Sequence, residues 1–130
     1  MNRLTWASLA VAVGLTAGCG DSPARGPGTG GAKDALADLG QMLKSLHDEG
    51  KQPPAAATEL TQVEPMVPVA GPLLRDGTVV YLWGAGYDAG GNKVVAHERR
   101  AATEGGYVLL QDGSVKEMTA DEFKAAPKAK

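Results

Sequence analysis

The apolar residues between positions 32 and 50 follow a helical period. Leucines recur there at intervals of three, four and three residues: Leu36, Leu39, Leu43 and Leu46. This spacing places them on one face of an amphipathic helix. Because barely two heptads are present, we expect this face to dock on the domain that follows. A short coiled-coil or partner-binding helix is the alternative.

Particular residues mark the ends and the interior of the predicted helix. Asp34 and Asp38 favour its first turns, because carboxylates are stabilised near a helix N-terminus, and Gly50 is suited to ending it. Gly40 costs about 1 kcal/mol relative to Ala, so the helix requires tertiary support or a partner. His47, near the C-terminal end, is predicted to be solvated or to cap the helix.

Prolines punctuate residues 51–72 and predict a connector. A short helical turn is expected at residues 55–63, with Pro54 near its start. The prolines that follow exclude a long regular element. The apolar side chains of this connector are expected to lie along the core as an extended cover: Leu60, Val63, Met66 and Val69.

From residue 73 onward, short β-branched or aromatic runs alternate with turn residues. They predict antiparallel strands at residues 78–83, 93–98, 107–110 and 114–118. The first run is apolar on both faces, as in a central strand that is covered on two sides. We therefore expect an α+β fold, with a small antiparallel β-meander of three or four strands in a β-rich domain at 73–126.

A short C-terminal helix is expected to close this domain. Thr119 and Glu122 have the capping-box spacing that opens a helix, and residues 127–130 form a tail. The core is predicted to include Val80, Leu82, Val94, Val108, Leu110, Val115 and Phe123.

The pattern Leu-x-Asp-Gly-(Ser/Thr)-Val occurs twice, at residues 74–79 and 110–115. Asp-Gly between strand-like runs is a strong hairpin signal, because such turns need positive φ, which Gly adopts freely. We therefore predict one turn type used twice, at Asp76-Gly77 and at Asp112-Gly113. A shared calcium site is the alternative, although calcium needs about six to eight oxygens and each copy supplies one carboxylate.

Composition narrows the possible chemistry. The chain has 13 basic and 15 acidic residues and no basic block, so nucleic acid is a poor candidate partner. One cysteine excludes an internal disulfide and a cysteine-based zinc site, which needs several ligands.

The glycine-rich run WGAGYDAGG at residues 83–91 lacks the spacing of a dinucleotide-binding motif, and no helix pattern follows it. It therefore predicts a long flexible hairpin loop. Trp83 and Tyr87 are the candidate binding surface, because aromatic side chains near loops often serve recognition. We favour the alternative that both side chains pack on the sheet, because the core has few other large residues.

The one conceivable cluster of catalytic-type residues is His97, Glu98, Glu104 and Asp112. Alternation along a strand places His97 and Glu98 on opposite faces, so His97 is predicted to be a surface strand residue. Arg99 and Arg100 are predicted to form an exposed strand end. The sequence therefore predicts no catalytic residue, no metal ligand and no cofactor.

The first 19 residues have the layout of a secretory signal: Arg3 gives a positive start, and an uncharged run extends from Leu4 to Leu15. This run is shorter than the roughly 20 apolar residues that span a membrane. Residues 1–18 are therefore predicted to be a signal peptide.

The end of this segment, Ala17-Gly18-Cys19, resembles the lipobox of bacterial lipoproteins, although Thr16 stands where they usually carry leucine. The resemblance implies that Cys19 is lipidated and becomes the mature N-terminus. An ordinary signal peptide with an unmodified cysteine is the alternative. Residues 20–31 are rich in Gly and Pro, so 19–31 is predicted to be a lipidated cysteine followed by a flexible tether.

Residues 105–123, GGYVLLQDGSVKEMTADEF, resemble the C-terminal tail of bacterial pseudopilin-like proteins, and residues 94–98 resemble the strand before that tail. Ala102 stands where that family usually has histidine, and the N-terminus lacks a pilin-type cleavage signal and long helix. The resemblance implies a β-meander end shared with envelope proteins, not a pilus subunit.

The layout from Cys19 onward resembles small uncharacterised bacterial lipoproteins. We therefore expect a non-catalytic cell-envelope protein that is anchored to the membrane by lipid after secretion and has a structural or protein-binding role. An envelope protein is its expected partner. A small-ligand or metal-binding module that uses the 84–91 loop is the alternative.

Overall fold

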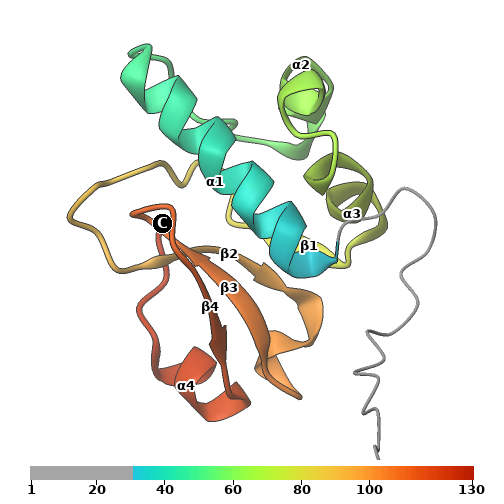
Figure 1. Ribbon diagram of the computed structural model, residues 1–130, viewed down its shortest axis with the longest axis vertical. Helices are drawn as coiled ribbons and strands as arrows, with labels where there is room; N and C mark the ends of the chain where they lie inside the picture. Colours follow the sequence, from blue (N-terminus) through green and yellow to red (C-terminus); the bar gives the residue numbers. More distant parts are fainter. Residues whose placement is uncertain (1–30) are drawn as a thin grey trace, which may run out of the picture.

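The computed structural model describes residues 31–130, in which helices pack around a four-stranded antiparallel sheet (Figure 1). The strands are adjacent in chain order: β1 (Val79–Tyr81), β2 (Val94–Glu98), β3 (Gly106–Leu110) and β4 (Val115–Met118). The helices are α1 (Ala32–Asp48), η1 (Ala57–Glu59), α2 (Leu60–Val63), η2 (Glu64–Met66), α3 (Ala70–Asp76), η3 (Arg99–Ala102) and α4 (Ala120–Ala125). This arrangement confirms the predicted α+β class and meander. The predicted signal peptide, Cys19 and all of the tether before residue 31 lie outside the described residues.

Helix α1 docks on the sheet through its leucine face, as predicted. All four leucines are buried in one cluster with Val79, Val95 and Leu109 of the sheet. Burial of each leucine contributes roughly 1.5–3 kcal/mol. A Cβ on Gly40 would lie 2.9 Å from Cδ1 of Leu109, so the glycine permits close packing of α1 on β3. This packing offsets the low helix propensity of glycine.

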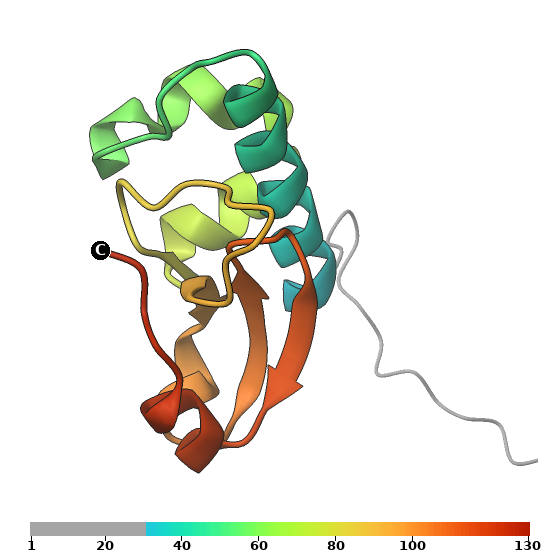
Figure 2. The same cartoon turned by 90° about the vertical axis from the view of Figure 1, so that its left-hand side faces the viewer.

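Different elements cover the two faces of the sheet. Side chains in register across the strands face α1: Tyr81, Ala96, Leu109 and Val115. The opposite face carries another row: Val80, His97, Val108 and Lys116. There Phe123 of α4 packs with Val94 and Val108 in a second, smaller cluster. In Figures 1 and 2, α4 lies at the far end of the molecule from α2.

The predicted core is correct in part. Val94, Val108 and Phe123 are buried, whereas the remaining four are half-buried: Val80, Leu82, Leu110 and Val115. In β1 the fully buried residues are instead Val79 and Tyr81, which belong to the larger cluster against α1. The difference arises because the longest helix covers their face of the sheet.

The connector is helical, so the expectation of an extended cover is wrong. The expected turn at residues 55–63 forms η1 and α2, but η2 continues it, and α3 crosses the predicted boundary between residues 72 and 73. Pro72 lies in the first turn of α3, where proline is tolerated. Leu60 is buried, whereas Met66 is 39% exposed and does not cover the core.

Asp38 links α1 to the start of α3. Its Oδ2 accepts hydrogen bonds from the backbone N–H groups of Val69 (3.0 Å) and Ala70 (3.2 Å). The first N–H groups of a helix have no acceptor within the helix, and a carboxylate stabilises them. Asp38 was expected to favour the start of its own helix, and the structure shows that it caps α3.

The two Asp-Gly pairs do not form the same turn, so that prediction is wrong. Gly77 (φ 82°) ends helix α3, whereas Gly113 (φ 86°) lies in the β3–β4 hairpin. Both glycines do adopt the positive φ that the pattern predicted. A left-handed glycine suits a helix end and a hairpin loop equally well.

The C-terminal segment returns to the sheet. Thr119 Oγ1 accepts a hydrogen bond from Glu122 N (3.1 Å), and Glu122 Oε1 accepts one from Thr119 N (3.2 Å), which confirms the capping box of α4. The predicted tail then pairs with the start of β2: Val94 N donates to Pro127 O and Ala129 N donates to Val94 O, both at 2.8 Å. The tail therefore occupies an edge of β2 that β1 leaves uncovered.

Candidate functional site

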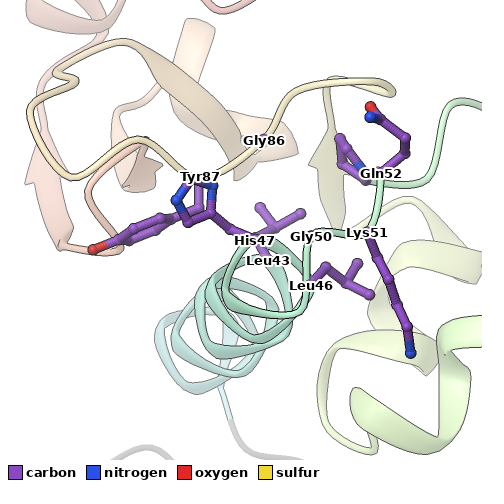
Figure 3. A pocket seen from close by; sticks show the side chains of 9 residues that line it. Leu43, Leu46, His47, Gly50, Lys51, Gln52, Gly86 and Tyr87 are labelled. Carbon is purple, nitrogen blue, oxygen red and sulfur yellow. The ribbon is translucent and has the colours of Figure 1, made fainter.

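A cavity of about 340 Å³ opens between the C-terminal end of α1 and the loop that joins β1 to β2 (Figure 3). Its apolar lining comes from Leu43, Leu46 and Pro53, and its polar lining from His47, Lys51, Gln52 and Tyr87. Gly50 and Gly86 complete the wall. The predicted 84–91 loop therefore contributes two residues, Gly86 and Tyr87, to a site that α1 completes.

Hydrogen bonds at three points hold the loop in place. Gly84 N donates to Pro54 O and Asp88 N donates to Gln111 O, both at 2.8 Å. The hydroxyl of Tyr81 donates to Ala85 O, and burial raises the pKa of this hydroxyl. These bonds fix the backbone on both sides of Gly86.

Tyr87 contacts the last turns of α1. Its ring centroid lies 5.3 Å from that of His47, and the Nζ of Lys44 lies 5.8 Å from the Tyr87 ring. Figure 3 shows the Tyr87 and His47 rings side by side. Lys44 also pairs with Asp48 at 2.7 Å, and this hydrogen bond raises the pKa of Lys44 and lowers that of Asp48. His47 is exposed, in agreement with its predicted solvation.

Trp83 and Tyr87 are both half-buried, and both pack against the main core cluster. The ring of Trp83 meets the ring of Tyr81 edge-on, with centroids 4.9 Å apart and planes at 77°. The two residues therefore pack on the core, as the favoured alternative predicted, and Tyr87 also lines the cavity.

His97 and Glu98 point to opposite faces of β2, as alternation predicted. The ring of His97 packs on Phe123 with centroids 4.6 Å apart, and its Nδ1 lies 2.7 Å from the carbonyl oxygen of Glu98. The neighbour of this imidazole nitrogen is therefore a backbone carbonyl.

Glu98 is a buried carboxylate whose environment the sequence did not predict. The residue is 8% exposed. Its oxygens accept hydrogen bonds from Tyr107 N (2.6 Å) and from the guanidinium of Arg100 (3.2 and 3.4 Å). The hydrogen bonds between Arg100 and Glu98 and the charge of Glu98 raise the pKa of Arg100. A Cβ on Gly106 would lie 2.4 Å from Glu98 Oε2, so this glycine makes room for the carboxylate.

The conceivable catalytic cluster is dispersed over the described fold. Glu98 lines a hollow of about 490 Å³ with Asp76, Thr78, Arg99, Arg100 and Thr103. Glu104 lines a separate hollow of about 320 Å³, and Asp112 lies in the β3–β4 turn. Arg99 and Arg100 are exposed as expected, but they begin η3 and are not a strand end.

Three further results bear on the kind of protein. Within residues 31–130, no three His, Cys, Asp or Glu side chains gather as metal ligands would. The helices described there are all too short or too polar to cross a membrane. Comparison of the chain with protein-family models, with curated proteins and with solved structures gave no match.

Proposed function

We propose that this chain is a non-catalytic, lipid-anchored cell-envelope protein with a structural or protein-binding role. The observation that carries the proposal is the run Ala17-Gly18-Cys19, which follows an uncharged segment and contains the one cysteine of the chain. A single cysteine at the end of a secretory signal is suited to lipid attachment.

The chemistry of acyl chains explains how such an anchor holds. Each buried CH₂ contributes about 0.8 kcal/mol, so one acyl chain binds a membrane reversibly and several hold it firmly. A tether of the composition at residues 20–31 spans roughly 20 Å on average. The folded domain would therefore stand off the bilayer surface.

The test is the substitution Cys19→Ser in the full chain. It removes the acyl acceptor, so we expect the protein to move from the membrane fraction to the soluble fraction and to lose acyl labelling. Thr16→Leu is the matched control, because it brings the sequence closer to the lipobox and should keep the label. Persistent acyl labelling of Cys19→Ser would exclude this anchor.

A small-ligand module is the second candidate, because the cavity at Gly86 and Tyr87 has a volume of about 340 Å³. Ligand pockets of about 300–1,000 Å³ are typical, and they combine an apolar lining with a few polar groups. A library screen by amide NMR tests this function. Saturable shifts at Gly86 and Tyr87 that Tyr87→Ala abolishes would favour it over the structural role.

A further inference from the structure

Strand β4 forms one outer edge of the sheet (Figures 1 and 2). Its residues Lys116 and Met118 pair with Val108 and Gly106 of β3, and Ser114 O accepts a hydrogen bond from Leu110 N. Hydrogen-bonded and non-hydrogen-bonded pairs alternate in an antiparallel ladder. Val115 and Glu117 therefore direct their backbone N–H and C=O groups away from β3, toward the open edge.

These outward groups have no hydrogen-bond partner elsewhere in residues 31–130. The side chains of Lys116 and Glu117 are exposed, and Val115 and Met118 are half-buried. An unpaired strand edge is a template for a further strand. The two charged side chains determine which strands it can accept.

A second copy of the chain fits this edge poorly. Residues directly opposite in an antiparallel pair share a face of the sheet, and Lys116 and Glu117 lie on opposite faces. A two-fold pair of sheets centred on residue 116 or on residue 117 would place two Lys116 side chains or two Glu117 side chains directly opposite each other. Like charges in this position are destabilising. A pair centred on residue 115 would place Glu117 opposite Gly113, whose N–H already donates to Leu110 O within the hairpin.

We propose that the β4 edge accepts an extended segment of a partner protein, which pairs antiparallel with a basic residue opposite Glu117 and an acidic residue opposite Lys116. This inference rests on the protein-binding role proposed above and names the surface and the chemistry of the partner. Backbone hydrogen bonds at Val115 and Glu117 supply the attachment, as in other cases of strand addition. The two opposite-charge pairs select the sequence and its register.

The probe is the capped peptide Thr-Val-Lys-Glu-Val-Thr, titrated into the isotope-labelled full chain in detergent. In the proposed register its Lys faces Glu117, its Glu faces Lys116, and its second Val faces Val115. We expect saturable shifts of the Val115 and Glu117 amide signals that exceed those of Lys116 and Met118, whose N–H groups bond β3. Absence of saturation up to the solubility limit of the peptide would overturn the proposal.

Backbone N-methylation provides the matched control. Methylation of the Lys and the second Val removes the N–H groups that face β4, so we expect binding to be lost. Methylation of the first Val and the Glu removes N–H groups that point away, so we expect binding to persist. Equal binding of the two methylated peptides would contradict strand addition.

A charge exchange tests the selection of the partner. Glu117→Lys should weaken binding of the probe roughly fivefold, and replacement of the probe's Lys by Glu should restore it. Unchanged binding in Glu117→Lys would contradict the charge pairing. These measurements use soluble peptides and do not depend on Cys19, so their failure would leave the lipid anchor to be decided by membrane fractionation.

Discussion

The triplets Asp76-Gly77-Thr78 and Asp112-Gly113-Ser114 have the same local geometry in different surroundings. In each, the aspartate Oδ1 accepts the N–H two residues later, at 2.8 Å from Thr78 and 2.9 Å from Ser114. In each, the glycine has φ above 80°. The first triplet nevertheless joins helix α3 to β1, and the second joins β3 to β4.

This comparison shows that the repeated pattern determines a local conformation and leaves the flanking elements open. A left-handed glycine with an aspartate acceptor suits a helix end as well as a hairpin. The residues before the triplet decide the outcome. Residues 70–75 form helical turns that pack near α1, whereas residues 106–110 form the largely apolar strand β3.

The largest expected effect comes from the glycines. Gly77→Val and Gly113→Val should each cost about 1–3 kcal/mol of unfolding free energy, because a β-branched residue is strained at positive φ. A Cβ would meet only ordinary contacts there, at 3.5 Å from Arg99 and 3.7 Å from Tyr87. We therefore expect similar losses at the two sites, measured by denaturant unfolding.

Asparagine at the same positions is the control, since it tolerates the left-handed region better than valine. Gly77→Asn and Gly113→Asn should lose less stability than the valine variants. A large loss at one site only would show that tertiary surroundings, and not the shared φ, set the cost of substitution.

The aspartates should have smaller effects. Asp76→Ala and Asp112→Ala remove the hydrogen-bond acceptor and should lower stability by less than the glycine substitutions do, whereas Asp76→Asn and Asp112→Asn keep an acceptor oxygen and should cost less still. Hydrogen bonds from Thr78 and Ser114 lower the pKa of Asp76 and Asp112. Their contribution is therefore present above the ordinary aspartate pKa of 3.8 and is lost as pH falls through the lower folded pKa.

Thermal unfolding of these variants with and without calcium measures this prediction and separates a turn from an ion site. We expect calcium to leave the parent unchanged. Stabilisation of the parent by calcium, with no response in the Asn variants, would identify the aspartates as ion ligands.

Local patterns allowed several elements to be predicted. The leucine period marked α1, and the spacing of Thr119 and Glu122 marked the start of α4. Such features depend on residues three or four positions apart. The choice between Val79 and Val80 as core residues could not be made in this way, because β1 is apolar on both faces and only the docking of α1 distinguishes them.

The candidate site depends on contacts between distant segments, which the sequence pattern does not encode. His47 and Tyr87 meet because the β1–β2 loop is hydrogen-bonded to Pro54 and Gln111. Glu98 is buried because strand register brings its carboxylate to Tyr107 N. The sequence predicted the loop that carries Tyr87 and the opposite orientations of His97 and Glu98. It did not predict that Tyr87 contacts His47 or that Glu98 bonds to Tyr107 N.

The most direct test of the proposed lipid anchor is mass spectrometry of the N-terminal peptide of the protein extracted from membranes. The proposal predicts a mature chain that begins at Cys19 and carries several acyl chains on that residue. A chain that begins at another residue, or an unmodified Cys19, would contradict the proposal.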